Sequence, residues 1–413
     1  MRKRRSIMLR RVKRESHLSN PISYLYLVLP YGISSGFCSI TLPFVLVRHG
    51  YSVAAAASVV ALGLSANLWR FAGAPIVDLT LSLRRWYLLG LGACFVTLLG
   101  LGLMPLRVEN AVVLTLVVFL AQIGANLAII PVGGFIAHTV HEEEKGRAAG
   151  WYQAGNLGGM GLGGGAGVWI ASHHSFFAAS TVLALALLVS AFALRFVPDV
   201  SPFIEDSVKN RLGAMGRDLL ELVRTPLGLL TICLVTSPIG SGAMNNLWSA
   251  VAPDWHTGAD TVALVTGVLN GIISAIGCIA GGWIADRVGR WWSYFGSGTL
   301  IALIAIAMAL AAPTSGAFSI WVLSYAFACG IAYAAFSAIC LFATARGAAS
   351  TKYSLLSSFG NLPVIYVTAL DGWAHDRYGS AGMLFWEAAI GLIAVVLGGL
   401  AVAILKNRAA IPR

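Results

Sequence analysis

The feature that most constrains this chain is a succession of twelve apolar blocks, each separated from the next by a short polar connector. An apolar helix of about 20 residues crosses the roughly 30 Å hydrocarbon core of a bilayer. The blocks cover residues 22–47, 53–77, 86–105, 111–138, 148–171, 176–197, 227–251, 261–285, 293–312, 317–344, 354–371 and 383–405. The pattern predicts an all-α polytopic membrane protein with twelve transmembrane helices, which we number as spans one to twelve.

The composition argues against a soluble enzyme. Only 11% of the 413 residues are charged, and the mean hydropathy is +0.79. A soluble domain usually carries about 25% charged residues, because its whole surface faces water. The six cysteines lie inside the apolar blocks at irregular spacing, so we expect neither a disulfide framework nor a bound metal.

The basic residues predict the orientation of the chain in the membrane. If the N-terminus is cytoplasmic, 24 of the 28 Lys and Arg residues fall in cytoplasmic segments, and three fall outside, namely Arg48, Arg107 and Arg377. This imbalance satisfies the positive-inside rule, and twelve spans then place both termini in the cytoplasm. Eight basic residues lie within the first 14 positions. That cluster favours an anchor on anionic lipid over nucleic-acid binding or a cleaved signal, and we expect a multi-pass protein of the inner (plasma) membrane.

The longest polar connector divides the chain into two sets of six spans. The predicted division is a basic cytoplasmic head (1–21), an N-terminal six-helix bundle (22–197), a cytoplasmic linker (198–226), a C-terminal six-helix bundle (227–405) and a cytoplasmic tail (406–413). Apolar residues recur every three or four positions in the linker, which predicts an amphipathic helix on the cytoplasmic leaflet. We expect this helix to be a passive tether between the bundles rather than a regulatory site.

Matching cytoplasmic turns occur in the two halves. The turn after span two contains Gly73, Asp78, Arg84 and Arg85, and the turn after span eight contains Gly282, Asp286, Arg287 and Arg290. A small residue lets two helices approach closely, and an aspartate can accept hydrogen bonds from the nearby arginines or cap a helix N-terminus. We interpret the eight residues as a cytoplasmic gate for alternating access. The alternative is a pair of ordinary basic loops.

The second turn resembles the signature loop of the major facilitator superfamily, Gly-x-Leu-Ala-Asp-Arg-x-Gly-Arg, with Trp283 and Ile284 in its apolar positions. The stretch from Arg70 to Asp78 is similar to one in the branch that holds AmpG-type muropeptide permeases and acetyl-CoA transporters, and two further stretches, 142–146 and 351–358, resemble the same branch. The resemblance implies two pseudo-symmetric six-helix bundles around a central site. It also implies two carboxylates in span four, where this chain has Ile129 and Gly133.

One charged residue lies inside an apolar block at a position where it could bind a solute. Arg70 sits two helical turns from Asp78, so it cannot easily reach the membrane surface. A buried guanidinium fork suits a phosphate or carboxylate of a substrate. The alternative is a structural pair with a polar neighbour, and the sequence favours neither.

Uncharged polar residues within the spans predict the remaining walls of a substrate cavity. The candidates are Gln122, Asn126, Asn156, Asn245, Asn270, Tyr333 and Asn361, with Gln153 and Asn246 as further buried amides. Amides in hydrocarbon need partners, so we expect about half of them to join helices instead. Gln122 and Asn126 share one helix face and are therefore the stronger candidates.

Two carboxylates, Glu387 and Asp371, lie inside spans twelve and eleven and could carry a coupling proton if they are buried. Both lie near the outer ends of their spans, where carboxylates are usually hydrated. A glycine-rich stretch over 155–167 lacks the Lys-Ser/Thr pair of a phosphate-binding loop, so we interpret it as close helix packing. We find no nucleotide-binding motif and expect no cofactor.

The sequence thus predicts a monomeric secondary transporter, driven by an ion or solute gradient, for a small-molecule substrate. The branch resemblance implies an anionic, amphiphilic solute such as a muropeptide or an acyl-CoA-like compound. A transporter of the same fold for a sugar or a drug-like solute is the first alternative. A polytopic membrane enzyme and a sensor that does not transport are the less favoured ones, and a catalytic cluster at one membrane face, which an enzyme needs, is missing from the sequence.

Overall fold

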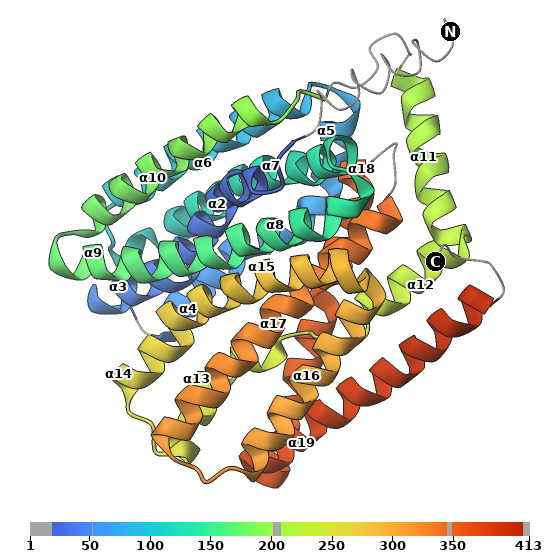
Figure 1. Ribbon diagram of the computed structural model, residues 1–413. Coiled ribbons are helices and arrows are strands. Elements are labelled where there is room, and N and C mark those ends of the chain that lie inside the picture. Colours follow the sequence, from blue (N-terminus) through green and yellow to red (C-terminus); the bar gives the residue numbers. More distant parts are fainter. Residues whose placement is uncertain (1–18, 52, 201–207, 345–348, 408–413) are drawn as a thin grey trace, which may run out of the picture.

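The computed structural model describes residues 19–51, 53–200, 208–344 and 349–407, and every regular element in these ranges is a helix (Figure 1). The first half contains α2 (Ser23–Gly36), η1 (Phe37–Thr41), α3 (Leu42–Arg48), α4 (Val53–Leu64), η2 (Ser65–Trp69), α5 (Arg70–Leu79), α6 (Leu83–Leu103), η3 (Val108–Asn110), α7 (Ala111–Thr139), η4 (Glu142–Glu144), α8 (Lys145–Gly161), η5 (Leu162–Ala166), α9 (Gly167–His173), α10 (Phe176–Phe192) and η6 (Ala193–Phe196). The linker contains α11 (Val208–Arg224).

The second half begins directly after the linker helix. It contains α12 (Pro226–Val235), η7 (Ala243–Asn246), α13 (Trp248–Val251), η8 (Ala252–Trp255), α14 (Ala259–Val262), η9 (Ala263–Leu269), α15 (Asn270–Val288), α16 (Arg290–Leu310), α17 (Ser315–Thr344), α18 (Ala349–Phe359) and α19 (Asn361–Asn407). In Figure 1 the first half, in blue and green, forms one bundle, and the second half, in yellow to red, forms the other.

The helices correspond to the twelve predicted spans. Nine helical segments within the described residues are long and apolar enough to cross a membrane. One of them, Ala349–Leu405, has 57 residues and bends at Gly379, where φ is 70°, so it supplies spans eleven and twelve. Span five is the glycine-rich run 145–173, and span seven is the interrupted run from α12 through α13. The fold is therefore all-helical over the described residues, with twelve spans in two six-helix halves.

Several spans change helix type or break near their middle. Span two passes through the 3-10 segment η2 directly before Arg70, and span five passes through the π-helical segment η5. Span seven breaks after α12, where Gly240 and Gly242 adopt positive φ values of 64° and 69° that only glycine takes without strain. Irregular backbone at membrane depth is tolerated where it is buried in protein or lines a cavity.

Small residues bring the two halves together. α8 of the first half packs along α15 of the second, and α5 packs against α18. A Cβ atom added to Gly150 would lie 2.9 Å from the Cα of Gly282, and one added to Gly161 would lie 3.3 Å from the Cα of Gly271. The glycines of span five therefore serve close helix packing, because their missing side chains let the α8 and α15 backbones touch.

The linker is helical over Val208–Arg224, within the stretch predicted to form an amphipathic helix. Leu222 is buried, whereas Arg217 and Arg224 are exposed. Residues 201–207 of the predicted linker and residues 1–18 of the basic head lie outside the described residues.

Candidate functional site

A cavity of about 180 Å³ lies between the two halves near the middle of the spans. Its walls come from α2, α5, α7 and α8 of the first half and from α12, α16, α17, α18 and α19 of the second, together with the break in span seven. The lining residues are Tyr31, Arg70, Ile129, Tyr152, Gln153, Asn156, Leu157, Val235, Ser237, Ile239, Gly240, Ser241, Tyr294, Tyr333, Phe336, Ser357, Gly360, Asn361, Pro363 and Val364. The wall thus combines aromatic rings and aliphatic side chains with hydroxyls, amides and one guanidinium.

Arg70 is the one charged side chain among these lining residues. It is the first residue of α5, directly after η2, so the change of helix type sets its position. Its Nη2 donates to the Ser357 hydroxyl of the opposite half at 2.8 Å, and its guanidinium carbon lies 5.9 Å from the centre of the Tyr31 ring. Its buried Nε has no hydrogen-bond partner among the described residues, so the guanidinium can still donate.

Amides from span five form a second polar group in the wall. Gln153 donates to the Ser337 hydroxyl of α17 at 2.6 Å, and Asn156 donates to the Gln153 side-chain oxygen at 3.1 Å. Asn361 makes one long bond, 3.4 Å, to the Ser357 carbonyl and is exposed. The amides are therefore partly satisfied by protein and keep donors and acceptors for a ligand.

Tyr333 and Tyr152 line this part of the cavity, and the Tyr353 ring contacts Tyr152. Tyr333 donates to the Ser241 carbonyl at 3.0 Å, which holds its ring beside the break in span seven. The rings of Tyr152 and Tyr353 meet edge to face across the two halves, with centroids 5.6 Å apart. The ring of Tyr353 packs on Gly133, where an added Cβ would lie 2.7 Å from a ring carbon. Gly133 is one of the two span-four positions at which the branch resemblance implies a carboxylate. The Tyr353 ring fills the space that a carboxylate side chain would need there.

The structure places the other predicted polar residues away from this cavity. Gln122 bonds Ser34 and Ser35 of α2 at 3.3 Å each, and Asn126 donates to the Ala66 carbonyl and the Asn67 side chain in η2. Both amides therefore join helices within the first half.

Two predicted amides of the second half are joined to each other. The Asn270 amide donates to the Asn245 side-chain oxygen at 3.2 Å. This bond ties the start of α15 to η7, the segment that follows the break in span seven. Of the seven predicted wall residues, the cavity thus brings together Asn156, Tyr333 and Asn361.

The two candidate coupling carboxylates lie in the interior of the second half. Asp371 is fully buried and Glu387 is 6% exposed, although their place near the outer face favoured hydration. The Tyr325 hydroxyl donates to Glu387 Oε1. Neither oxygen of Asp371 nor Oε2 of Glu387 has a hydrogen-bond partner among the described residues. The two groups are close enough for their charges to repel each other.

The Trp248 ring packs on Tyr325, the residue that donates to Glu387. It meets the Tyr325 ring edge to face with centroids 5.3 Å apart, and its buried Nε1 has no hydrogen-bond partner among the described residues. Two buried carboxylates with free acceptor oxygens form a site suited to a proton or another small cation, because a pair of bare charges in hydrocarbon is costly.

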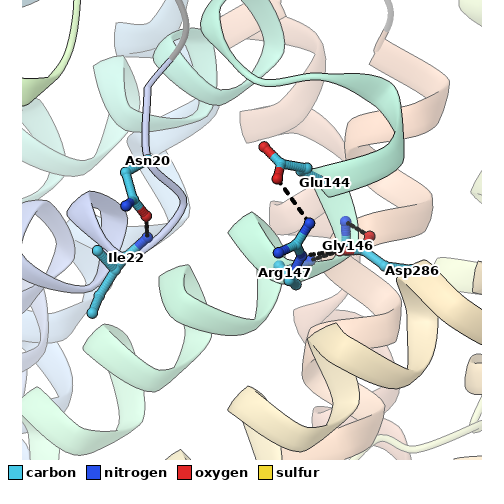
Figure 2. Close-up of polar contacts among 6 residues, drawn as sticks. All are labelled: Asn20, Ile22, Glu144, Gly146, Arg147 and Asp286. Carbon is cyan, nitrogen blue, oxygen red and sulfur yellow. Dashed lines mark hydrogen bonds and ion pairs between the residues drawn. The ribbon is translucent and has the colours of Figure 1, made fainter.

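At the cytoplasmic ends, the two gate aspartates cap helices of the opposite half. Asp286, near the end of α15, accepts from the backbone nitrogens of Gly146 and Arg147 at 2.7 and 2.9 Å, and from Arg147 Nε at 3.0 Å (Figure 2). Asp78, near the end of α5, accepts from the backbone nitrogen and the hydroxyl of Thr351, both at 2.8 Å. A carboxylate is favoured at a helix N-terminus, where backbone N–H groups are unpaired.

Three of the four predicted gate arginines have other partners. Arg84 donates to the Leu194 and Val197 carbonyls at 2.9 and 2.8 Å, within its own half. The guanidinium carbons of Arg287 and Arg290 lie 4.2 Å above the Trp283 ring and 3.5 Å above the Phe342 ring, respectively. Arg85 is exposed. Of the two interpretations of the aspartates, the structure therefore shows the helix-capping arrangement.

Gly73 and Gly282 differ in their surroundings. A Cβ added to Gly282 would lie 2.6 Å from the Gly146 carbonyl oxygen, so this position needs glycine for close contact between the halves. A Cβ added to Gly73 would lie 3.7 Å from the Ile130 side chain, an ordinary contact distance. Gly282 is therefore required at the second turn, whereas a larger side chain could be accommodated in place of Gly73 at the first.

Sequence analysis missed several partners in these sites, among them Ser337 and Ser357. Ser337 is an isolated serine in the apolar helix α17, and Ser357 belongs to a serine-rich stretch of α18. Serines within helices often bond to their own backbone, so neither is an evident partner in the sequence. One sequence feature does point to Ser357. It lies about two helical turns after Thr351 in α18, the helix that packs against α5 and therefore near Arg70.

Comparison with known families agrees with this architecture. The sequence pattern of the Major Facilitator Superfamily matches residues 2–153 and 110–368. The chain belongs to this superfamily. It is a multi-pass membrane transporter and not an enzyme. No curated protein matches it in sequence.

Solved structures of the superfamily share its fold. The proton:xylose symporter XylE has 14% sequence identity and a TM-score of 0.69, with 93% of this chain and 95% of that chain covered. The human organic anion transporter MFSD10 (TETRAN) has 13% identity and a TM-score of 0.70, with 91% and 98% covered. The fucose:proton symporter FucP of E. coli has 14% identity and a TM-score of 0.68, with 91% and 97% covered.

Proposed function

We propose that this superfamily member is a proton-coupled transporter of an organic anion, working as a monomer in the inner membrane, with Arg70 as its anion-binding residue. The observation that carries the proposal is the charge of the central cavity. Arg70 contributes a cation to that cavity, and no described lining residue contributes a carboxylate. A guanidinium in hydrocarbon is costly unless a partner neutralises it, and an anionic solute would supply that partner.

The size of the cavity favours a small solute. An apolar cavity of about 150 Å³ holds one benzene molecule, so about 180 Å³ suits a solute of roughly seven non-hydrogen atoms. A small organic acid fits this space as it stands. The muropeptide or acyl-CoA-like solutes implied by the branch resemblance are larger, and their transport would require the cavity to widen as the two halves rotate.

The carboxylate cluster supports coupling to protons. Asp371 and Glu387 lie in the half opposite Arg70, so a bound proton there would compensate charge without competing with the anion for Arg70. The Tyr325 hydroxyl fixes one oxygen of Glu387 and leaves the other free to hold the proton. Release of this proton would restore two repelling carboxylates, which favours a change of conformation.

The capping aspartates would supply the cytoplasmic gate. Both pairs cross between the halves, so the pairs Asp78–Thr351 and Asp286–Arg147 must break for the cytoplasmic side to open. The same hydrogen bonds can form again when the two halves close, so the gate is reversible. This is the requirement of alternating access about a midplane site.

A neutral sugar is the second candidate solute. The side-chain amides of Gln153, Asn156 and Asn361 provide donors and acceptors of the kind that sugars need. Two structural neighbours are described as a proton:xylose symporter and a fucose:proton symporter. On this alternative Arg70 would donate hydrogen bonds to sugar hydroxyls, and its charge would not matter for selectivity.

The test is uptake into proteoliposomes with an inward proton gradient imposed or collapsed. The solutes are labelled small carboxylic acids, neutral sugars, an anhydro-muropeptide and an acyl-CoA, and the variants are Arg70→Leu and Arg70→Lys. We expect gradient-dependent uptake of an acid, strongly reduced by Arg70→Leu and partly kept by Arg70→Lys. Arg195→Leu, which removes an exposed cytoplasmic arginine, is the matched control. Sugar uptake that survives Arg70→Leu would overturn the anion proposal.

A further inference from the structure

The linker helix α11 has two faces of different character. Its inner face carries Leu222, which is 4% exposed and belongs to the buried core, together with half-buried Met215 and Leu219. These positions are spaced by three and four residues, so they lie on one stripe of the helix. This stripe packs on the protein, and α11 contacts α5, the helix that carries Asp78.

Met215 reaches the cytoplasmic gate itself. Its sulfur lies 3.9 Å from the hydroxyl oxygen of Thr351, the same hydroxyl that donates to Asp78. Figure 1 shows α11 standing beside the ends of α5 and α18, which carry Asp78 and Thr351. The linker therefore touches the interaction that closes one side of the gate, a role that a passive tether would not need.

The outer face of α11 is both apolar and basic. Leu220 and Val223 are each 42% exposed, and Arg217 and Arg224 are exposed on the same side of the helix. The helix joins the cytoplasmic ends of spans six and seven, so it lies at the membrane boundary. Apolar side chains flanked by arginines are typical of a helix that inserts between anionic lipid headgroups.

We propose that α11 binds the anionic lipids of the cytoplasmic leaflet through Arg217, Leu220, Val223 and Arg224, and that this binding holds Met215 against Thr351 and stabilises the closed gate. The opening of the gate moves Thr351 away with the second half and pulls on α11, which also contacts α12 of that half, so α11 loses its lipid contacts in the open state. The bound lipid therefore favours the state in which Met215 and Thr351 touch.

The test measures the gate directly and needs no transported solute, so its outcome is independent of the substrate proposal. Spin labels are attached at Leu81→Cys in the first half and Trp292→Cys in the second, two exposed cytoplasmic positions, in a Cys233→Ser background. Label distances in the full-length protein are compared in vesicles of phosphatidylcholine and in vesicles with about one quarter phosphatidylglycerol.

We expect the anionic vesicles to raise the closed-to-open ratio, by about fivefold for each arginine that contacts lipid. Arg217→Gln with Arg224→Gln should abolish this lipid dependence, whereas the control Arg195→Gln should keep it. Met215→Ala should lower the ratio in both vesicles, and Met215→Leu, which keeps the bulk of the side chain, should restore it. The proposal is overturned if the ratio is the same in both vesicles, or if the α11 variants behave like the control.

Discussion

The Asp286→Asn substitution tests the gate most directly. Asp286 accepts three hydrogen bonds, from the Gly146 and Arg147 backbone nitrogens and from Arg147 Nε. Its side chain is 10% exposed, whereas that of Arg147 is 45% exposed, so the ion pair itself contributes only about 0.2–1 kcal/mol. An asparagine keeps one acceptor oxygen and turns its amino group toward the donors of Arg147.

The expected loss is therefore about 2 kcal/mol of closed-state stability, made up of weakened charged hydrogen bonds and the lost ion pair. That loss lowers the closed-to-open ratio by about 30-fold. Asp78 accepts two hydrogen bonds from Thr351 and has no ion pair within the described residues. Asp78→Asn should therefore cost only about 1 kcal/mol, or roughly fivefold.

The assay is the distance between spin labels at Leu81→Cys and Trp292→Cys, measured for both variants and for their combination in the same vesicles. The two caps share no residue, so their effects should add within about 0.5 kcal/mol. An unchanged distance distribution in Asp286→Asn would refute the reasoning, because it would mean that the cap does not hold the halves together. A larger shift in Asp78→Asn than in Asp286→Asn would refute the ranking.

Three further predictions follow from contacts elsewhere in the protein. Glu387→Gln should abolish stimulation of uptake by a proton gradient but leave solute exchange intact, because the amide cannot exchange the proton; loss of exchange as well would assign the residue to folding or binding. Gly150→Val should force the cytoplasmic ends apart, since its Cβ would lie 2.5 Å from the Cys278 carbonyl oxygen, and the label distances should lengthen. Hydrogen bonds from Ser380 and then His375 hold the pKa of Asp254 below its usual value. The Asp254 carboxylate therefore contributes its full stabilisation above about pH 5 and loses it as the pH falls below about 4. The thermal unfolding temperature of Asp254→Asn should accordingly vary less with pH across this range than that of the parent protein.

The gate also explains why the two halves carry similar turns. Asp78 near the end of span two caps the start of span eleven, and Asp286 near the end of span eight caps the start of span five. Each half thus supplies one carboxylate and one helix N-terminus, as expected for two halves related by a pseudo-two-fold axis along the membrane normal. The pairs differ in that Arg147 adds a charge to only one of them.

The sequence by itself determined the membrane architecture. The lengths of the apolar blocks, the bias of arginine and lysine, and the long connector at 198–226 are local properties, and a bilayer converts them directly into spans and orientation. The superfamily turn at Gly282 to Arg290 was equally visible, because its residues are consecutive.

Only the tertiary structure decided which polar residues share a site. Gln122 and Asn156 are both amides in apolar helices, yet one joins α7 to α2 and the other lines the cavity. The choice depends on how each helix is rotated about its axis, and that rotation is set by packing against helices that are distant in the sequence. The same holds for the burial of Asp371, since only the assembled second half shields a position so near the outer face from water.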